Sequence, residues 1–289
     1  MSSMFAVLDA QKFIVVLLLT IVPSILLLSL ILYSDRKSRE PLMMILICIL
    51  SGAFTICLSL IVDKIVIACH FIIGDLLTNS YSYSIYKIMI LAGVEEYAKL
   101  LVLHLFLYKN RAYDDIYDGF VYSSIIALSF AVIETFMYVF NESTYADMTS
   151  LAILRNFTSI PLHIACGIAM GHFVSLEKFS KVKKWKFINL VLAMVVPIFI
   201  HTVYNSFFSI ASLSNGTVLS VVIILIFVLS VYFVGVMFIY KTHKLNKIFI
   251  TNGDYPKRYR YLLNKFEFET NKINEKREGV IYNDTGSVL

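Results

Sequence analysis

Acidic, basic, histidine and amide side chains occur in this sequence at spacings that suit chemistry on helices. The residues concerned are Glu95, Glu96, Lys99, Phe130, Glu134, Arg155, His163, His201 and Asn205. Glu95 and Lys99 are four residues apart, so on a helix they share one face and can pair. His201 and Asn205 have the same spacing. The spacing therefore predicts two helix faces that each carry a pair of polar groups. Glu134, Arg155 and His163 lie between these two pairs in the sequence.

The residue types in this set are those that peptide hydrolysis requires. A buried glutamate can act as the base that activates water. A neutral histidine and an asparagine amide can donate hydrogen bonds to a developing oxyanion. Two neighbouring carboxylates, from Glu95 or Glu96 and from Glu134, can share a proton. The candidate catalytic residues are Glu95, Glu96, Glu134, His163, His201 and Asn205, and the candidate supporting residues are Lys99, Arg155 and Phe130.

Other catalytic mechanisms fit the sequence less well. It contains no HExxH zinc motif and no GxSG or GxGD motif. Glu95, Glu134, His163 and His201 are acceptable zinc ligands, so a divalent metal stays an alternative. Their spacing carries no metal signature, and we expect no metal and no other cofactor. An ion pair of Lys99 with a glutamate also has a purely structural interpretation.

The composition places these residues in a membrane. Of 289 residues, 58% are hydrophobic and only 16% are charged, whereas soluble domains have roughly 45–50% apolar residues. A membrane-spanning helix needs about 20 mostly apolar residues. We predict an all-α, polytopic transmembrane helix bundle of about seven spans. They lie at 13–33, 41–62, 86–108, 116–140, 151–175, 187–209 and 217–240, and 63–77 either extends the second helix or lies along the interface.

The positions of Lys and Arg predict the orientation in the bilayer. The loops 34–40, 109–115 and 176–186 hold ten of them, and the opposite side holds three. The positive-inside rule then places the N-terminus outside and the C-terminus in the cytoplasm. We expect a membrane domain at 1–240 and a basic cytoplasmic tail at 241–289. The net charge of +5 thus needs no nucleic-acid partner, and the lipid bilayer is the expected surrounding.

Five charged residues lie inside the predicted spans: Glu95, Glu96, Lys99, Glu134 and Arg155. Each costs at least ~2.5 kcal/mol in the membrane, which makes such residues functional candidates. With a rise of 1.5 Å per residue, the glutamates and histidines lie about 9–18 Å from the outer end of their spans. We therefore expect them to share one layer, somewhat outside the midplane.

The motifs Glu95-Glu96-x-x-Lys99, Phe130-x-x-x-Glu134 and His201-x-x-x-Asn205 resemble the three motifs of the PrsW family of intramembrane proteases. That family is similar to the CAAX-endopeptidase and bacteriocin-processing group, with motifs EExxxR, FxxxH and HxxxN. Tyr117-Asp118-Gly119, and Arg155 followed by His163 and Gly167, resemble further family positions. The resemblance covers roughly residues 86–209, the expected protease core. Thr135 departs from a frequent Asn, and Asn205 from a frequent Asp.

The resemblance implies a glutamate-dependent protease of the bacterial cell membrane. Such enzymes make the first, extracytoplasmic-side cut in a single-span anti-sigma factor, which starts release of a sigma factor in the envelope-stress response. By analogy, Glu95 would activate water with Glu134 beside it. His201 and Asn205 would form the oxyanion hole.

Two other functions fit part of the sequence. A proton- or ion-coupled carrier would use the intramembrane charges as a relay, although a relay extends along the membrane normal and no span pair shows Gly/Pro-broken halves. A non-catalytic peptide-binding or immunity relative is the second alternative. The intact set of acids, histidines and asparagine favours the protease.

Overall fold

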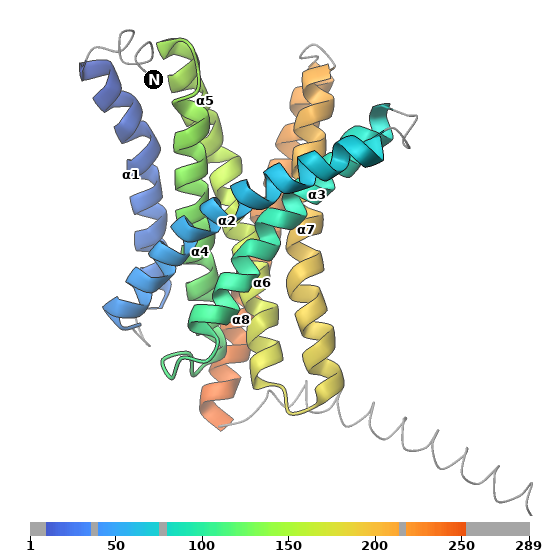
Figure 1. Cartoon of the computed structure of the whole chain (residues 1–289). Helices are drawn as coiled ribbons and strands as arrows, with labels where there is room; N and C mark the ends of the chain where they lie inside the picture. Colours follow the sequence, from blue (N-terminus) through green and yellow to red (C-terminus); the bar gives the residue numbers. More distant parts are fainter. Residues whose placement is uncertain (1–9, 36–39, 75–79, 214–217, 253–289) are drawn as a thin grey trace, which may run out of the picture. The chain divides into compact units, whose positions relative to one another are not determined.

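The computed structural model describes residues 10–35, 40–74, 80–213 and 218–252 of the chain. In these ranges every regular element is helical, which confirms the all-α prediction. The elements are α1 (Ala10–Ser34), α2 (Leu42–Gly74), α3 (Ser80–Val102), a π-helix η1 (Leu103–Leu107), α4 (Ile116–Val139), α5 (Tyr145–Phe157), α6 (Ser159–Phe179), α7 (Lys183–Leu213) and α8 (Val218–Asn252) (Figure 1).

The chain divides into two compact units, Met1–His243 and Lys244–Leu289. The helix bundle and the site belong to the first unit. Most of the predicted tail, residues 253–289, lies outside the described residues. The predicted boundary at 240 therefore stays a prediction.

Several helices are long and apolar enough to cross a membrane. In the described part, five segments qualify by length and composition: Ala10–Ser34, Leu42–Val62, Ile116–Val139, Tyr145–Phe179 and Lys183–Ser209. The chain is therefore a helical membrane protein. α3, which carries Glu95, Glu96 and Lys99, is not among these five. The seven-span layout and its orientation stay predictions.

The structure bears on two sequence expectations about helix boundaries. Residues 63–74 continue α2, and residues 75–77 lie outside the described residues. The fifth predicted span, 151–175, lies within the candidate span Tyr145–Phe179, but its helix is interrupted at Thr158, because α5 ends at Phe157 and α6 begins at Ser159. Pro161 has no N–H to bond the carbonyl four residues earlier. That carbonyl, of Phe157, instead accepts a hydrogen bond from the Tyr232 hydroxyl of α8 at 3.1 Å.

The closest helix packing joins α4 to α6. A Cβ built on Gly171 would lie 2.0 Å from the carbonyl oxygen of Gly119, and one on Gly167 would lie 2.7 Å from that of Ser123. The Ser123 hydroxyl donates to the Gly167 carbonyl at 2.7 Å. Gly167 and Gly171 lie one turn apart on α6, and their lack of a side chain allows this close packing. This contact fixes the two helices that carry Glu134 and His163.

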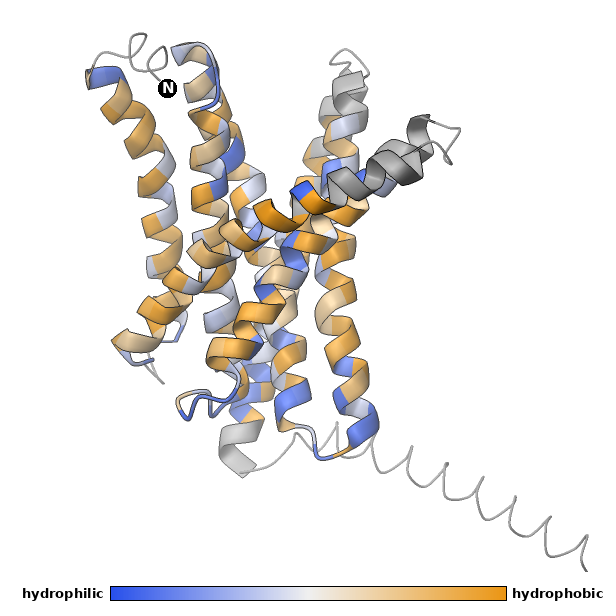
Figure 2. Ribbon diagram, in the orientation of Figure 1, coloured by the Kyte–Doolittle hydropathy of each residue, from blue (hydrophilic) through white to orange (hydrophobic). Residues whose placement is uncertain are grey.

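The remaining helices surround this pair. α7 packs against α6 and α3, α2 packs against α4 and α3, and α1 packs against α4 and α5. The α3–α4 and α6–α7 connections lie at one end of the bundle, together with the C-terminal end of α1 (Figure 1). Hydrophilic residues gather in these connections, whereas the described residues along α1, α2 and α7 are mostly hydrophobic (Figure 2). Two of the three predicted basic loops thus lie at one end of the bundle, and residues 36–39 of the third lie outside the described residues.

Candidate active site

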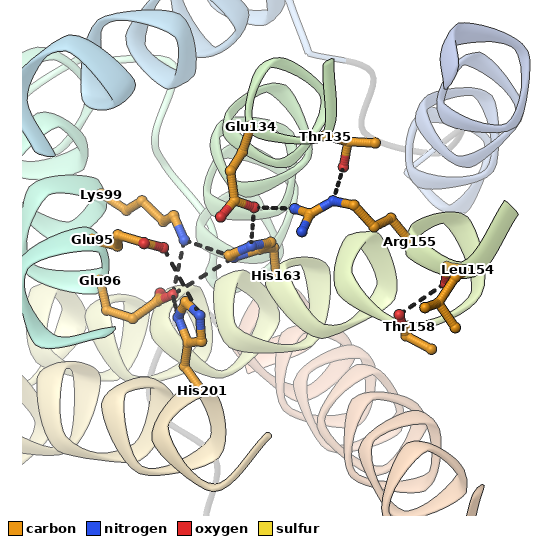
Figure 3. A network of polar contacts seen from close by, with 10 residues as sticks. All are labelled: Glu95, Glu96, Lys99, Glu134, Thr135, Leu154, Arg155, Thr158, His163 and His201. Atoms are coloured by element: carbon orange, nitrogen blue, oxygen red, sulfur yellow. Dashed lines mark hydrogen bonds and ion pairs between the residues drawn. The ribbon is translucent and has the colours of Figure 1, made fainter. Parts of the chain in front are cut away.

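Glu96 is the centre of a buried polar network (Figure 3). Its side chain is fully buried, and Oε1 lies 2.8 Å from Nζ of Lys99 and 2.9 Å from Nδ1 of His201. An ionised carboxylate only accepts hydrogen bonds, so Nδ1 of His201 must carry the proton it donates. The Nε2 nitrogen of a neutral His201 is then an acceptor. It lies 3.9 Å from Oε2 of Glu95.

Lys99 connects Glu96 to the next helix pair. Besides Glu96, its Nζ contacts Nδ1 of His163 at 3.0 Å and the ring face of Phe130 at 4.0 Å from the centroid. An ammonium has three donors and no acceptor. The carboxylate, the imidazole and the π-face supply three partners, so the buried charge is compensated on all sides. Nδ1 of His163 therefore accepts, and its Nε2 carries a proton.

That second nitrogen of His163 contacts Glu134. Nε2 lies 3.0 Å from Oε2 of Glu134, and the same oxygen accepts from Nη2 of Arg155 at 2.5 Å. Nε of Arg155 donates to the Thr135 hydroxyl at 3.1 Å. The guanidinium also lies over the Tyr138 ring, 4.5 Å from its centroid. Oε2 of Glu134 is thus fixed by two donors.

The network brings together residues from five helices. α3 supplies Glu95, Glu96 and Lys99, α4 supplies Phe130 and Glu134, α5 and α6 supply Arg155 and His163, and α7 supplies His201. The break at Thr158 places Arg155 in the last turn of α5 and His163 in the second turn of α6. Both side chains reach Glu134 from this joint (Figure 3). The residues that the depth estimates place in one layer thus contact one another through this network.

Glu95 and Glu134 differ from the other charged residues because they line a cavity of about 310 Å³. The side chains of Glu95 and Glu134 are 16% and 15% exposed, whereas Glu96, Lys99 and His163 are at most 1% exposed. Water and a substrate can therefore reach Glu95 and Glu134. Glu96 is enclosed by protein and serves to hold His201 and Lys99.

Asn205 is the predicted site residue that stands apart from this network. It lies one turn after His201 on α7 and is partly buried. Among the described residues, no hydrogen bond links Asn205 to Glu95, Glu134 or His201. Its predicted place in an oxyanion hole stays a prediction.

Sequence reasoning assigned no role to several residues that shape the site. Thr135 was noted only as a departure from the family pattern, yet it fixes Arg155. Tyr138 stacks on Arg155 and lines the cavity. Ile56, Ser59 and Leu60 of α2 form the facing wall. Tyr138 lies four residues after Glu134, and this spacing was a usable signal; the α2 residues have no such signal.

The same side chains can be tested as metal ligands. Glu95, His163 and His201 each offer one atom, and these atoms lie within 4.8 Å of one another. Two imidazoles and a carboxylate are a known zinc donor set. His201 is oriented as metal ligands usually are, with its other nitrogen bonded to a carboxylate. The residues therefore fit a divalent cation, provided that His163 turns one nitrogen away from Lys99 or Glu134.

Comparison with known proteins gives a family match. Residues 40–234 match the family model described as PrsW family intramembrane metalloprotease. The match begins before α2 and ends within α8, so it extends well beyond residues 86–209, which carried the motif resemblance. The family match therefore includes α2 and the first half of α8, whereas α1 lies outside it.

Individual relatives agree with the family model. The protein named Protease PrsW from Clostridioides difficile is 33% identical over 65% of this chain and 76% of its own length. Protease PrsW from Oceanobacillus iheyensis is 30% identical over 73% of this chain and 91% of its own length. Protease PrsW from Bacillus subtilis is 26% identical over 68% of this chain and 82% of its own length. No solved structure matches the chain.

Proposed function

This chain belongs to the PrsW family of intramembrane proteases, and we propose that it cuts its substrate with Glu95 as the base that activates water. The observation that carries this assignment is the difference between two adjacent glutamates. Glu95 lines the cavity, while Glu96 is fully buried and bonded to Lys99 and His201. Of these two adjacent glutamates, only Glu95 can approach both a water molecule and a peptide carbonyl.

In this mechanism Glu95 takes a proton from water, and the resulting hydroxide attacks the carbonyl carbon. The carbonyl oxygen becomes an oxyanion, which then collapses and expels the amine. The amine leaves with the proton held by Glu95, so that an acid and an amine replace the amide and the water. Glu134 lines the same cavity, with Oε2 held by His163 and Arg155. Glu134 therefore positions the attacking water or the leaving amine.

The structure constrains the proposed oxyanion donors. Because Nδ1 of His201 faces Glu96, Nε2 donates to an oxyanion only when His201 is protonated. The Glu96 carboxylate, 2.9 Å away, stabilises such an imidazolium, as the aspartate of a catalytic triad does. The Asn205 amide supplies a second donor if the substrate draws it toward His201.

If the family's metal is used, Glu95, His163 and His201 are the residues that hold it. A divalent cation lowers the pKa of bound water and polarises a carbonyl. Glu134 is then the carboxylate that lines the cavity without being one of the three ligands. In the mechanism with a metal and in the mechanism without one, Glu96 holds His201 in the same orientation.

We infer the finer biological role from the resemblance. The substrate is a single-span anti-sigma factor of a bacterial cell membrane, and the cut near its outer face starts envelope-stress signalling. The orientation with the N-terminus outside and the C-terminus in the cytoplasm supports this. Glu134 lies five residues before the end of α4, which corresponds to about 7–8 Å at 1.5 Å per residue. A cut at this depth leaves most of the substrate span in the membrane.

The test is cleavage of a candidate single-span anti-sigma factor by the purified protein in detergent. Wild type, Glu95→Gln and His201→Ala would be compared, each with and without a chelator. We expect loss of cleavage in both variants. Chelator-resistant cleavage by wild type supports water activated by glutamate alone, and chelator-sensitive cleavage supports the metal form. Full activity of Glu95→Gln would overturn the assigned base.

A further inference from the structure

The cavity beside Glu95 and Glu134 is elongated along α4. Its wall on α2 is formed by Ile56, Ser59 and Leu60, and its wall on α4 continues from Phe130 to the end of the helix. The α4 side comprises Phe130, Glu134, Met137, Tyr138 and Asn141. Asn141 lies two residues beyond the last residue of α4. The cavity, called here the α2–α4 cleft, thus extends from the carboxylates to the predicted outer end of the bundle.

The geometry of a helix keeps its backbone away from Glu95. The Cα atoms of a helix lie about 2.3 Å from its axis, whereas the side chains widen it to about 10–12 Å, so its peptide bonds are surrounded by its own side chains and bonded to one another. A peptide bond can therefore reach Glu95 only in an extended segment. A membrane-spanning substrate must unwind locally before it is cut.

An extended segment exposes backbone N–H and C=O groups, which need partners at membrane depth. The hydroxyl of Ser59 donates to the carbonyl of Ile56 at 3.0 Å, and its oxygen lone pairs remain able to accept from an N–H. The amide of Asn141 is exposed at the other end of the α2–α4 cleft and can both donate and accept. Ile56, Leu60 and Met137 supply apolar surface between these polar groups.

We propose that the α2–α4 cleft is the substrate-binding subsite on the outer side of the scissile bond. It takes a short extended stretch of a membrane-spanning chain that enters from the Asn141 end. Ser59 and Asn141 bind the backbone of this stretch, and an apolar substrate side chain packs against Leu60 and Met137. The inference rests on the proposed protease function and adds the conformation and the entry route of the substrate.

Two adjacent residues of α2 give a matched test of entry. Leu60 lines the α2–α4 cleft and is 41% exposed, while Ile61 is 60% exposed and does not line it. Leu60→Trp should fill the space and lower kcat/KM at least tenfold for the anti-sigma factor that wild type cuts. Ile61→Trp should change kcat/KM less than twofold. Equal effects of the two tryptophans, at equal thermal midpoints, would overturn the proposed route.

A second experiment reads the substrate conformation without requiring cleavage. Met137 lines the α2–α4 cleft at 43% exposure, whereas its neighbour Phe136, at 39%, does not. Met137→Cys and Phe136→Cys would be made in a Glu95→Gln protein whose natural cysteines are replaced by alanine. Each variant would be oxidised with anti-sigma factors carrying one cysteine at successive positions of the outer half of the span.

Cross-linking from Met137→Cys should occur at every second substrate position, because side chains alternate along an extended chain. Cross-links at every third or fourth position would show a helical substrate and overturn the proposal, as would equal cross-linking from Phe136→Cys. If wild type fails to cut the anti-sigma factor, the proposed function is contradicted for that substrate. The spacing of the cross-links still decides between an extended and a helical bound form.

Discussion

Nδ1 of His201 lies 2.9 Å from Oε1 of the buried Glu96, and this contact assigns separate roles to two consecutive glutamates. Glu96 fixes the ring and the tautomer of His201, and thereby directs Nε2 toward Glu95. Helical geometry explains the split, because consecutive residues face different directions on a helix. One glutamate supports the site while its neighbour faces the α2–α4 cleft.

The ion pair of Glu96 with Lys99 gives the first prediction. Glu96→Gln leaves a buried ammonium without its counter-ion, which we expect to destabilise the protein by about 3–5 kcal/mol. The double variant Glu96→Gln/Lys99→Met removes both charges and should recover most of that loss. The thermal midpoint in detergent measures this, with the exposed Lys64→Met as a control that should change little. A double variant less stable than Glu96→Gln would contradict the assigned pairing.

Arg155 is predicted to position Glu134. Its guanidinium bonds Glu134 and Thr135 while lying over Tyr138, a geometry that a lysine cannot reproduce. Loss of a charge-assisted hydrogen bond of about 1.5–3 kcal/mol corresponds to a roughly 10- to 150-fold lower kcat in Arg155→Lys.

Thr135→Val removes only the neutral partner of Arg155 and should lower kcat by about tenfold or less. Both effects should appear in kcat more than in KM, because the substrate contacts of the α2–α4 cleft remain. Steady-state cleavage kinetics and the thermal midpoint would be measured on the same preparations. A fall in kcat that follows the thermal midpoint would instead indicate a structural role for Arg155.

Local patterns in the sequence predicted the all-helical class and most of the helices, and helix depth predicted that Glu95, Glu134, His163 and His201 lie in one layer. The depth of a residue can be estimated because a helix has a fixed rise per residue, so the span boundaries indicate which residues lie at equal depth. Depth does not give rotation about the helix axis. For that reason it could not distinguish Glu95 from Glu96, and it did not show that Asn205 lies outside the hydrogen-bond network.

The break at Thr158 was within reach of sequence reasoning, because Pro161 removes a backbone donor. The wall formed by Ser59 and Leu60 could not be predicted from the sequence. It depends on how α2 packs on α4, where a Cβ on Gly52 would lie 2.5 Å from the Ile126 carbonyl oxygen. Such a contact depends on two helices together and leaves no pattern in either helix alone.

The close contact of α4 with α6 gives a further prediction. Gly171→Ala would place a methyl group 2.0 Å from the Gly119 carbonyl oxygen, so the helices must separate. We expect destabilisation of about 1–3 kcal/mol or more, with loss of cleavage as His163 moves from Glu134. Gly93→Ala is the matched control, because its nearest neighbour, Cδ1 of Ile198, would be 3.9 Å away. That variant should be as stable as wild type or more stable by about 0.5–1 kcal/mol.

A buried carboxyl outside the spans predicts a pH dependence of stability. Asp35 follows α1 and is 5% exposed. Burial, and then the nearby charges of Glu40 and Asp115, raise its pKa from 3.8 to about 7. Between these two values the folded chain holds a proton that the unfolded chain has released. Stability from this group is therefore complete below about pH 4 and is lost as the pH rises to about 7.

Asp35→Asn removes this titration, so the thermal midpoint of the variant should fall less than that of wild type between pH 4.5 and 7.5. Above pH 7.5 the variant should be the more stable of the two, because wild type then either carries a buried charge or pays to protonate it. Asp114→Asn is the control, since Asp114 belongs to the loop before α4 but is exposed. It should keep the pH slope of wild type. Identical slopes for wild type and Asp35→Asn would show that Asp35 is ionised throughout, and that its surroundings at the end of α1 admit water.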